Sequence, residues 1–64
     1  DYHLTNREKE VLACIVEELE YKMISDKLSI SYETVRRHVK KIYVKMHVAS
    51  LTEAVGKAMR ERIV

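Results

Sequence analysis

Residues 31–46 read SYETVRRHVKKIYVKM, and this stretch decides the fold prediction. Its apolar residues recur every third or fourth position, which is the spacing of one buried face of an α-helix. That face consists of Val35, Val39, Ile42 and Met46. The rest of the stretch holds five lysines and arginines against a single glutamate. The pattern therefore predicts an amphipathic helix whose outer side is strongly basic.

The cations of this helix fall into two groups when successive residues are placed 100° apart. Arg36, Arg37 and Lys40 lie across from the apolar face, in the first half of the helix. The second group, Lys41 and Lys45, lies on one flank together with the polar Thr34. Like charges recur four residues apart here, whereas a helix built for solubility usually interleaves glutamate with lysine. A polyanionic partner would offset this repulsion.

Such a helix fits the major groove of duplex DNA, where residues near the helix N-terminus reach base edges. Arg36, Arg37 and Lys40 are the candidate base contacts, because arginine can bind guanine O6 and N7 through two hydrogen bonds. The candidate phosphate contacts lie at the helix start or on its flank and are Ser31, Thr34, Lys41 and Lys45. A basic face that is merely solvated is the competing interpretation.

The remaining sequence predicts three further helices. Thr5 and Glu8 have the spacing of a capping box at a helix start, and so do Ser50 and Glu53. The predicted helices span about residues 6–18, 21–28, 32–46 and 51–63. Only three residues join the second helix to the third, which is helix-turn-helix spacing. The prediction is an all-α fold, a compact four-helix domain with a central helix-turn-helix.

Length and composition agree with one small helical domain. The chain has 64 residues, 47% of them apolar, with one glycine and no proline. Because it begins with aspartate rather than methionine, we expect residues 1–64 to be the C-terminal fragment of a longer protein. The net charge is +2, but residues 1–31 carry seven acidic against four basic side chains. Residues 32–47 carry five basic against one acidic, and this asymmetry suggests a polyanion partner.

Several function classes are not expected. Cys14 is the single cysteine, which predicts no disulfide framework and fits a reducing cytoplasm. No apolar run reaches membrane-spanning length, so we expect no membrane partner. His3, His38 and His47 match no zinc-binding spacing with Cys14, so we expect no metal. There is no nucleophile–base pair and no glycine-rich phosphate loop, so we expect neither enzyme activity nor a cofactor.

Four separated motifs point to one family. They are LTNREKEVL at residues 4–12, KMISDKLSIS at 22–31, TVRRHVKKIYVKM at 34–46 and VASLTEAV at 48–55. Together they resemble the LuxR-type (GerE/FixJ/NarL-like) DNA-binding domain of bacterial transcription regulators, over about residues 4–58. The resemblance implies a recognition helix in the major groove and dimers on DNA that form through the fourth helix.

Carried over by position, the resemblance places base contacts on Arg36, Arg37 and Lys40, and it adds Lys22 to the phosphate contacts. It also places the dimer interface on the fourth helix, for which we name Val55, Ala58 and Met59. The implied function is sequence-specific binding of double-stranded DNA for transcription regulation, as the output domain of a two-component response regulator in the bacterial cytoplasm. Further expected partners are a receiver domain or a ligand-binding domain of the same chain, and RNA polymerase.

Four features depart from the family pattern. Glu18 stands where the family usually has glycine, so either its backbone is left-handed or the first helix runs longer. Met46-His47 replaces the usual leucine-glycine, so we expect a different exit from the third helix. Tyr21 replaces the usual asparagine, so the family's phosphate contact is not carried over there. Leu51 replaces the usual arginine, and we expect it to join the core rather than to enlarge an apolar dimer surface.

Two rival functions remain at this stage. One is a helical protein-interaction module whose basic face meets an acidic protein. The other is a sigma-factor-like promoter-recognition domain. The salt dependence of DNA binding separates the first from a DNA-binding regulator, because release of counterions makes phosphate binding strongly salt-dependent. A cognate site that is not a repeat would favour the second.

Overall fold

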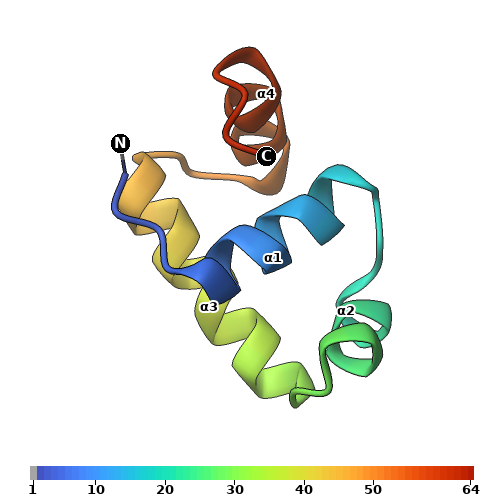
Figure 1. Cartoon of the computed structure of the whole chain (residues 1–64). Coiled ribbons are helices and arrows are strands. Elements are labelled where there is room, and N and C mark those ends of the chain that lie inside the picture. The colour runs from blue at the N-terminus through green and yellow to red at the C-terminus, as the bar shows by residue number, and fades with distance from the viewer. Residues whose placement is uncertain (1) are drawn as a thin grey trace.

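The computed structural model describes residues 2–64, which form four helices and no strand (Figure 1). The helices are α1 (Asn6–Val16), α2 (Tyr21–Leu28), α3 (Tyr32–Met46) and α4 (Leu51–Arg60). α3 packs against the other three helices, and α1 packs against α4 as well. In Figure 1, α1 crosses α3, with α4 above and α2 below. The all-α prediction, with α2 and α3 as the helix-turn-helix, is confirmed.

The hydrophobic core lies where α3 meets its neighbours. The predicted apolar face of α3 is buried, with Val35, Ile42 and Met46 fully inaccessible and Val39 at 4% exposure. The other helices contribute Val11, Leu12, Cys14, Ile15, Ile24, Ala54 and Ala58. Burial of each large apolar side chain stabilises the fold by about 1.5–3 kcal/mol. This packing fixes which side of α3 faces solvent.

Side-chain caps define the helix starts. The Glu8 N–H donates to Thr5 Oγ1 at 3.1 Å, and the Thr5 N–H donates to Glu8 Oε1 at 2.9 Å, which confirms the first capping box. At α4, the Glu53 N–H donates to Ser50 Oγ at 3.2 Å. The Glu53 carboxylate accepts from the Ala49 N–H at 2.8 Å rather than from Ser50, so the second box is displaced by one residue.

Each of the four helices is followed, one or two positions after its last residue, by a non-glycine residue with a left-handed backbone. These residues are Glu18 (φ 65°), Ser29 (φ 57°), His47 (φ 57°) and Arg62 (φ 53°). The N–H of the next residue then bonds back to a carbonyl five positions earlier, as in a Schellman motif. The four bonds are Leu19 to Cys14 (3.1 Å), and Ile30 to Ser25, Val48 to Tyr43 and Ile63 to Ala58 (3.0 Å each).

The residue that makes each of these bonds is apolar, and its side chain packs against the core. An apolar contact at this position commonly accompanies the motif. A left-handed backbone costs a residue with a Cβ roughly 1–2 kcal/mol, which the bond and the apolar contact offset. Each connection is therefore fixed by a backbone hydrogen bond and by the packing of one apolar side chain.

The structure corrects three predictions, two on helix ends and one on Leu51. α1 ends at Val16 and α4 at Arg60, so the predicted ends at 18 and 63 are too late. The first ends early because Glu18 takes the left-handed conformation, and Arg62 likewise follows the end of α4. Leu51 does not join the core: it is 38% exposed at the start of α4.

Candidate nucleic-acid interface

The outer face of α3 presents a row of cations to solvent. Because the opposite face is anchored in the core, Arg36, Arg37, Lys40 and Lys41 are all exposed. The structure thus places the three predicted base contacts on one side of a single rigid helix, with Lys41 beside them. Positions three and four apart are neighbours on a helix, so these side chains form a continuous basic surface.

The charges on this surface are largely uncompensated. Within residues 2–64, no carboxylate lies within ion-pair distance of Arg37, Lys40 or Lys41. Arg36 has an ion pair with Glu33, but the Nη1–Oε1 distance is 4.0 Å and both side chains are more than half exposed. A pair of this kind contributes little to stability. The face can therefore receive an anion without first losing strong internal contacts.

The start of α3 places two predicted phosphate contacts side by side. The Thr34 N–H donates to Ser31 Oγ at 3.0 Å, and the two side-chain hydroxyl oxygens are 2.8 Å apart. Ser31 is exposed and Thr34 is half-buried. A helix N-terminus favours anions, because its first N–H groups and the helix dipole present positive charge. Lys22 is exposed on α2, the other helix of the helix-turn-helix.

Lys45 has a different environment from the other cations of α3. Its Nζ donates to Glu8 Oε1 at 2.7 Å and to the His3 carbonyl oxygen at 3.1 Å. The Glu8 side chain is 2% exposed and that of Lys45 is 30% exposed. The ammonium thus joins α1 to α3. Because Glu8 and the His3 carbonyl hold it, it is not available for the phosphate contact that the sequence predicts for Lys45.

This contact sets the ionisation of Glu8. Burial alone would raise the pKa of its carboxyl. The hydrogen bond from Lys45, the Thr5 N–H and the nearby positive charge together outweigh burial, so the pKa lies below its ordinary value. Glu8 therefore stays ionised as a buried partner of Lys45.

A second lysine also ties helices together. Lys57 Nζ donates to the Met46 carbonyl oxygen at 2.8 Å, which satisfies a backbone acceptor at the end of α3. The same ammonium lies 5.0 Å from the centre of the Tyr2 ring, a cation–π contact. The residues that hold α3 in place, Glu8 and Lys57, were not identified as such from the sequence. No local pattern signals contacts between positions this far apart.

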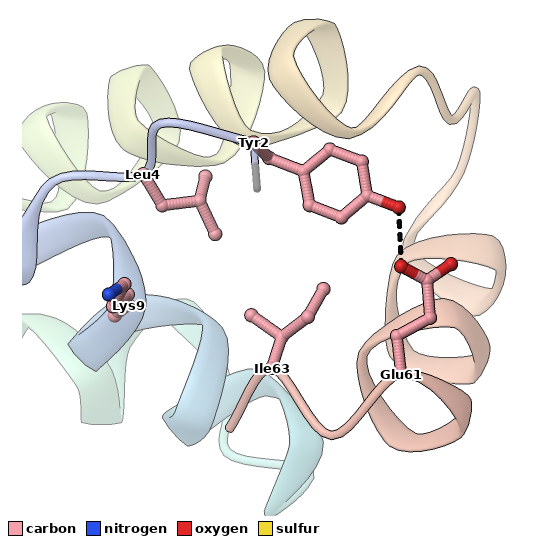
Figure 2. A pocket seen from close by; sticks show the side chains of 5 residues that line it. All are labelled: Tyr2, Leu4, Lys9, Glu61 and Ile63. Carbon is pink, nitrogen blue, oxygen red and sulfur yellow. Dashed lines mark hydrogen bonds between the residues drawn. The ribbon is translucent and has the colours of Figure 1, made fainter.

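The two ends of the described chain meet at a small pocket (Figure 2). Tyr2 points across it, and its hydroxyl donates to Glu61 Oε1 at 2.6 Å. This bond to a carboxylate raises the pKa of Tyr2 above its ordinary value. Leu4 and Ile63 face each other across the pocket (Figure 2). The segment that precedes α1 is thereby attached to the segment that follows α4.

An apolar groove runs between the α1–α2 connection and α4. Its apolar lining includes Val16, Leu19, Leu51, Val55 and Met59. Met59 is 62% exposed, and Val55 is half-buried.

Of the three predicted dimer residues, two are accessible and one is buried. Met59 and Val55 reach this groove. Ala58 is fully buried in the core, so its assignment to a dimer surface is corrected: its side chain offers no area to a partner. Leu51 is accessible instead, and it lines the groove together with Val55 and Met59.

Residues 2–64 contain no group of three or more histidine, cysteine, aspartate or glutamate side chains that could hold a metal ion. Over the same residues, every helix is too short or too polar to cross a bilayer.

Comparison with known proteins gives a consistent result. Residues 2–58 match the family described as bacterial regulatory proteins, luxR family. The chain is 42% identical over 60 residues to the nitrate/nitrite response regulator protein NarL of Escherichia coli K12, and equally to NarL of Escherichia coli O6:H1. The match covers 94% of this chain but 28% of each NarL protein, so the chain spans less than a third of these relatives. The chain belongs to the LuxR family of bacterial regulatory proteins, a family of DNA-binding transcription regulators rather than enzymes.

Proposed function

We propose that this chain binds double-stranded DNA sequence-specifically and regulates transcription as the output domain of a two-component response regulator. The observation that carries the proposal is the exposed set of cations on the outer face of α3, in which, among residues 2–64, Arg36 alone has an ion pair, at 4.0 Å. The response-regulator assignment is supported by the likeness to NarL, whose name describes one. Its receiver domain would lie elsewhere in a longer protein.

In this proposal α3 enters the major groove. Arg36, Arg37 and Lys40 contact base edges, because they lie on the face opposite the core. The phosphate contacts are Ser31, Thr34, Lys41 and Lys22, which surround that face or lie on α2. Lys45 is left out of this set, because its ammonium is held by Glu8.

The proposed complex on DNA is a dimer. Met59, Leu51 and Val55 form the apolar surface that α4 leaves accessible, and burial of such a surface against a second copy favours association. Two copies related by a two-fold axis require two half-sites on the DNA. We also propose that RNA polymerase at the promoter is a partner of the chain and that the chain acts in the cytoplasm.

The test begins with selection of bound duplexes from a random pool, followed by affinity measurements at 50 and 200 mM salt. Lys22 and Lys41 alone would release enough counterions to lower the affinity by at least about tenfold over this range. An affinity that does not change with salt contradicts the proposal and favours a protein-interaction module. Selected sequences should contain two related half-sites; a single unrepeated site would contradict the dimer and leave DNA binding intact.

A further inference from the structure

One apolar side chain lies in the middle of the basic face of α3. Val44 is 74% exposed, more than Met59 at 62% or Met23 at 52%. At 100° per residue, Val44 lies roughly 180° from the middle of the buried stripe, so it points directly away from the core. Lys40, Lys41 and Lys45 line a shallow hollow around it.

We propose that Val44 reads the 5-methyl group of a thymine in the major groove. The inference rests on the proposed function, since it requires this face of α3 to meet duplex DNA. The thymine methyl is the apolar group that the four base pairs present in that groove. A valine side chain can form no hydrogen bond with a phosphate or a polar base edge, so this methyl is the group it matches.

The spacing along the helix supports this contact. Arg37, Lys40 and Val44 stand at positions i, i+3 and i+7, three of the four positions through which homeodomain recognition helices read bases. Arg37 and Val44 are two helical turns apart, which is about 10.5 Å along the axis. At about 3.4 Å for each base-pair step, the thymine lies roughly three base pairs from the base that Arg37 contacts.

The residues around Val44 distinguish it from an isolated apolar side chain on the surface. Single exposed apolar side chains are common on soluble proteins. Here, however, the neighbours that line the hollow are all lysines. One of them, Lys45, is fixed by its 2.7 Å bond to Glu8, so one wall of the hollow is held in place. The exposed Val44 side chain is thereby part of the same surface that carries the cations.

The experiment uses a duplex that the chain has selected from a random pool. Each thymine is replaced in turn by deoxyuridine, which removes only the 5-methyl group, and the affinity is measured each time. With the unaltered chain, one replacement in each half-site should lower the affinity by about fourfold, the effect of one buried methyl-sized group. With Val44→Ala, the penalty at that position should disappear while the other positions keep theirs.

Val64→Ala serves as the matched control, because Val64 is 47% exposed but lies outside α3. It should leave every deoxyuridine penalty unchanged. Circular dichroism verifies that Val44→Ala is folded, as expected for alanine at an exposed helix position. If no deoxyuridine penalty depends on residue 44, the inference is wrong although the proposed function stands. If no duplex is selected at all, the proposed function fails and the inference fails with it.

Discussion

The two ends of α3 use the same residue types for different purposes. In its first half, Arg36, Arg37 and Lys40 project into solvent with weak internal contacts or none among the described residues. In its last turn, Lys45 is bound to buried Glu8, and the Met46 carbonyl oxygen accepts from Lys57. The first half is therefore available to a ligand, whereas in the last turn the contacts of Lys45 and Met46 fix the orientation of the helix.

Residue type and helical position therefore do not alone decide the role of a charged side chain in this domain. Lys41 and Lys45 are one turn apart on the same helix. The first is exposed, and the second faces a carboxylate that lies 37 positions away in the chain. Substitutions of the exposed cations should therefore change DNA binding, whereas substitution of Lys45 should change stability.

The largest effect is expected at the last turn. Lys45→Ala leaves the Glu8 carboxylate buried with only the Thr5 N–H, so the free energy of unfolding should fall by about 2–3 kcal/mol. This is below the usual cost of breaking a fully buried pair, because Lys45 is partly exposed. Urea unfolding measures the change. Lys41→Ala is the matched control and should change stability by no more than about 0.5 kcal/mol. Equal losses in the two variants would remove the distinction between the ends of α3.

The next effect concerns the first half of the helix. Lys40→Ala should weaken binding to the selected duplex by about 1–3 kcal/mol and relax the preference at one base position, while stability stays nearly constant. Competition with duplexes that differ at single positions measures both effects. Lys9→Ala, at an exposed position of α1, is the control and should keep the full preference. A Lys40→Ala variant that binds every sequence more weakly by the same factor would mean that Lys40 contacts phosphate instead.

The smallest effect is a pH dependence that arises at the last turn. The pKa of Glu8 is lowered in the folded state, so ionised Glu8 favours folding. This stabilisation is fully present above the ordinary pKa near 4.5 and is lost as the pH falls through the lowered value. The difference in unfolding free energy between the unaltered chain and Glu8→Gln should therefore shrink below about pH 4.5. A difference that stays constant from pH 7 to pH 3 would show that the charge of Glu8 contributes nothing.

The sequence predicts the features of this molecule that depend on near neighbours. The buried stripe of Val35, Val39 and Ile42 follows from helical period, and the start of α1 follows from the Thr5 cap. The same period placed Arg36 and Arg37 on the outer face. These predictions succeed because three or four residues suffice to define them.

Other features depend on residues that are distant in the chain, and they could not be predicted in this way. Glu8 was identified as a capping residue, but its pairing with Lys45 requires α1 and α3 to be packed first. Leu51 was assigned to the core because it is apolar, although the space beside it is an open groove. Glu18 is a good helix former in isolation, yet the return of Leu19 to the core ends the helix before it.

The repeated form of the helix exits has a consequence for how this domain can vary. The connection Glu18–Leu19–Glu20 consists of a left-handed residue, an apolar anchor and the N-cap of the next helix, and Ser29–Ile30–Ser31 has the same form. The left-handed residue has an exposed side chain, so its side chain is not constrained by packing, whereas its backbone favours glycine. An insertion or deletion, in contrast, would move the anchor out of the core and the next helix out of register. Related chains should therefore keep an apolar residue at the anchor and hardly differ at all in the length of these connections.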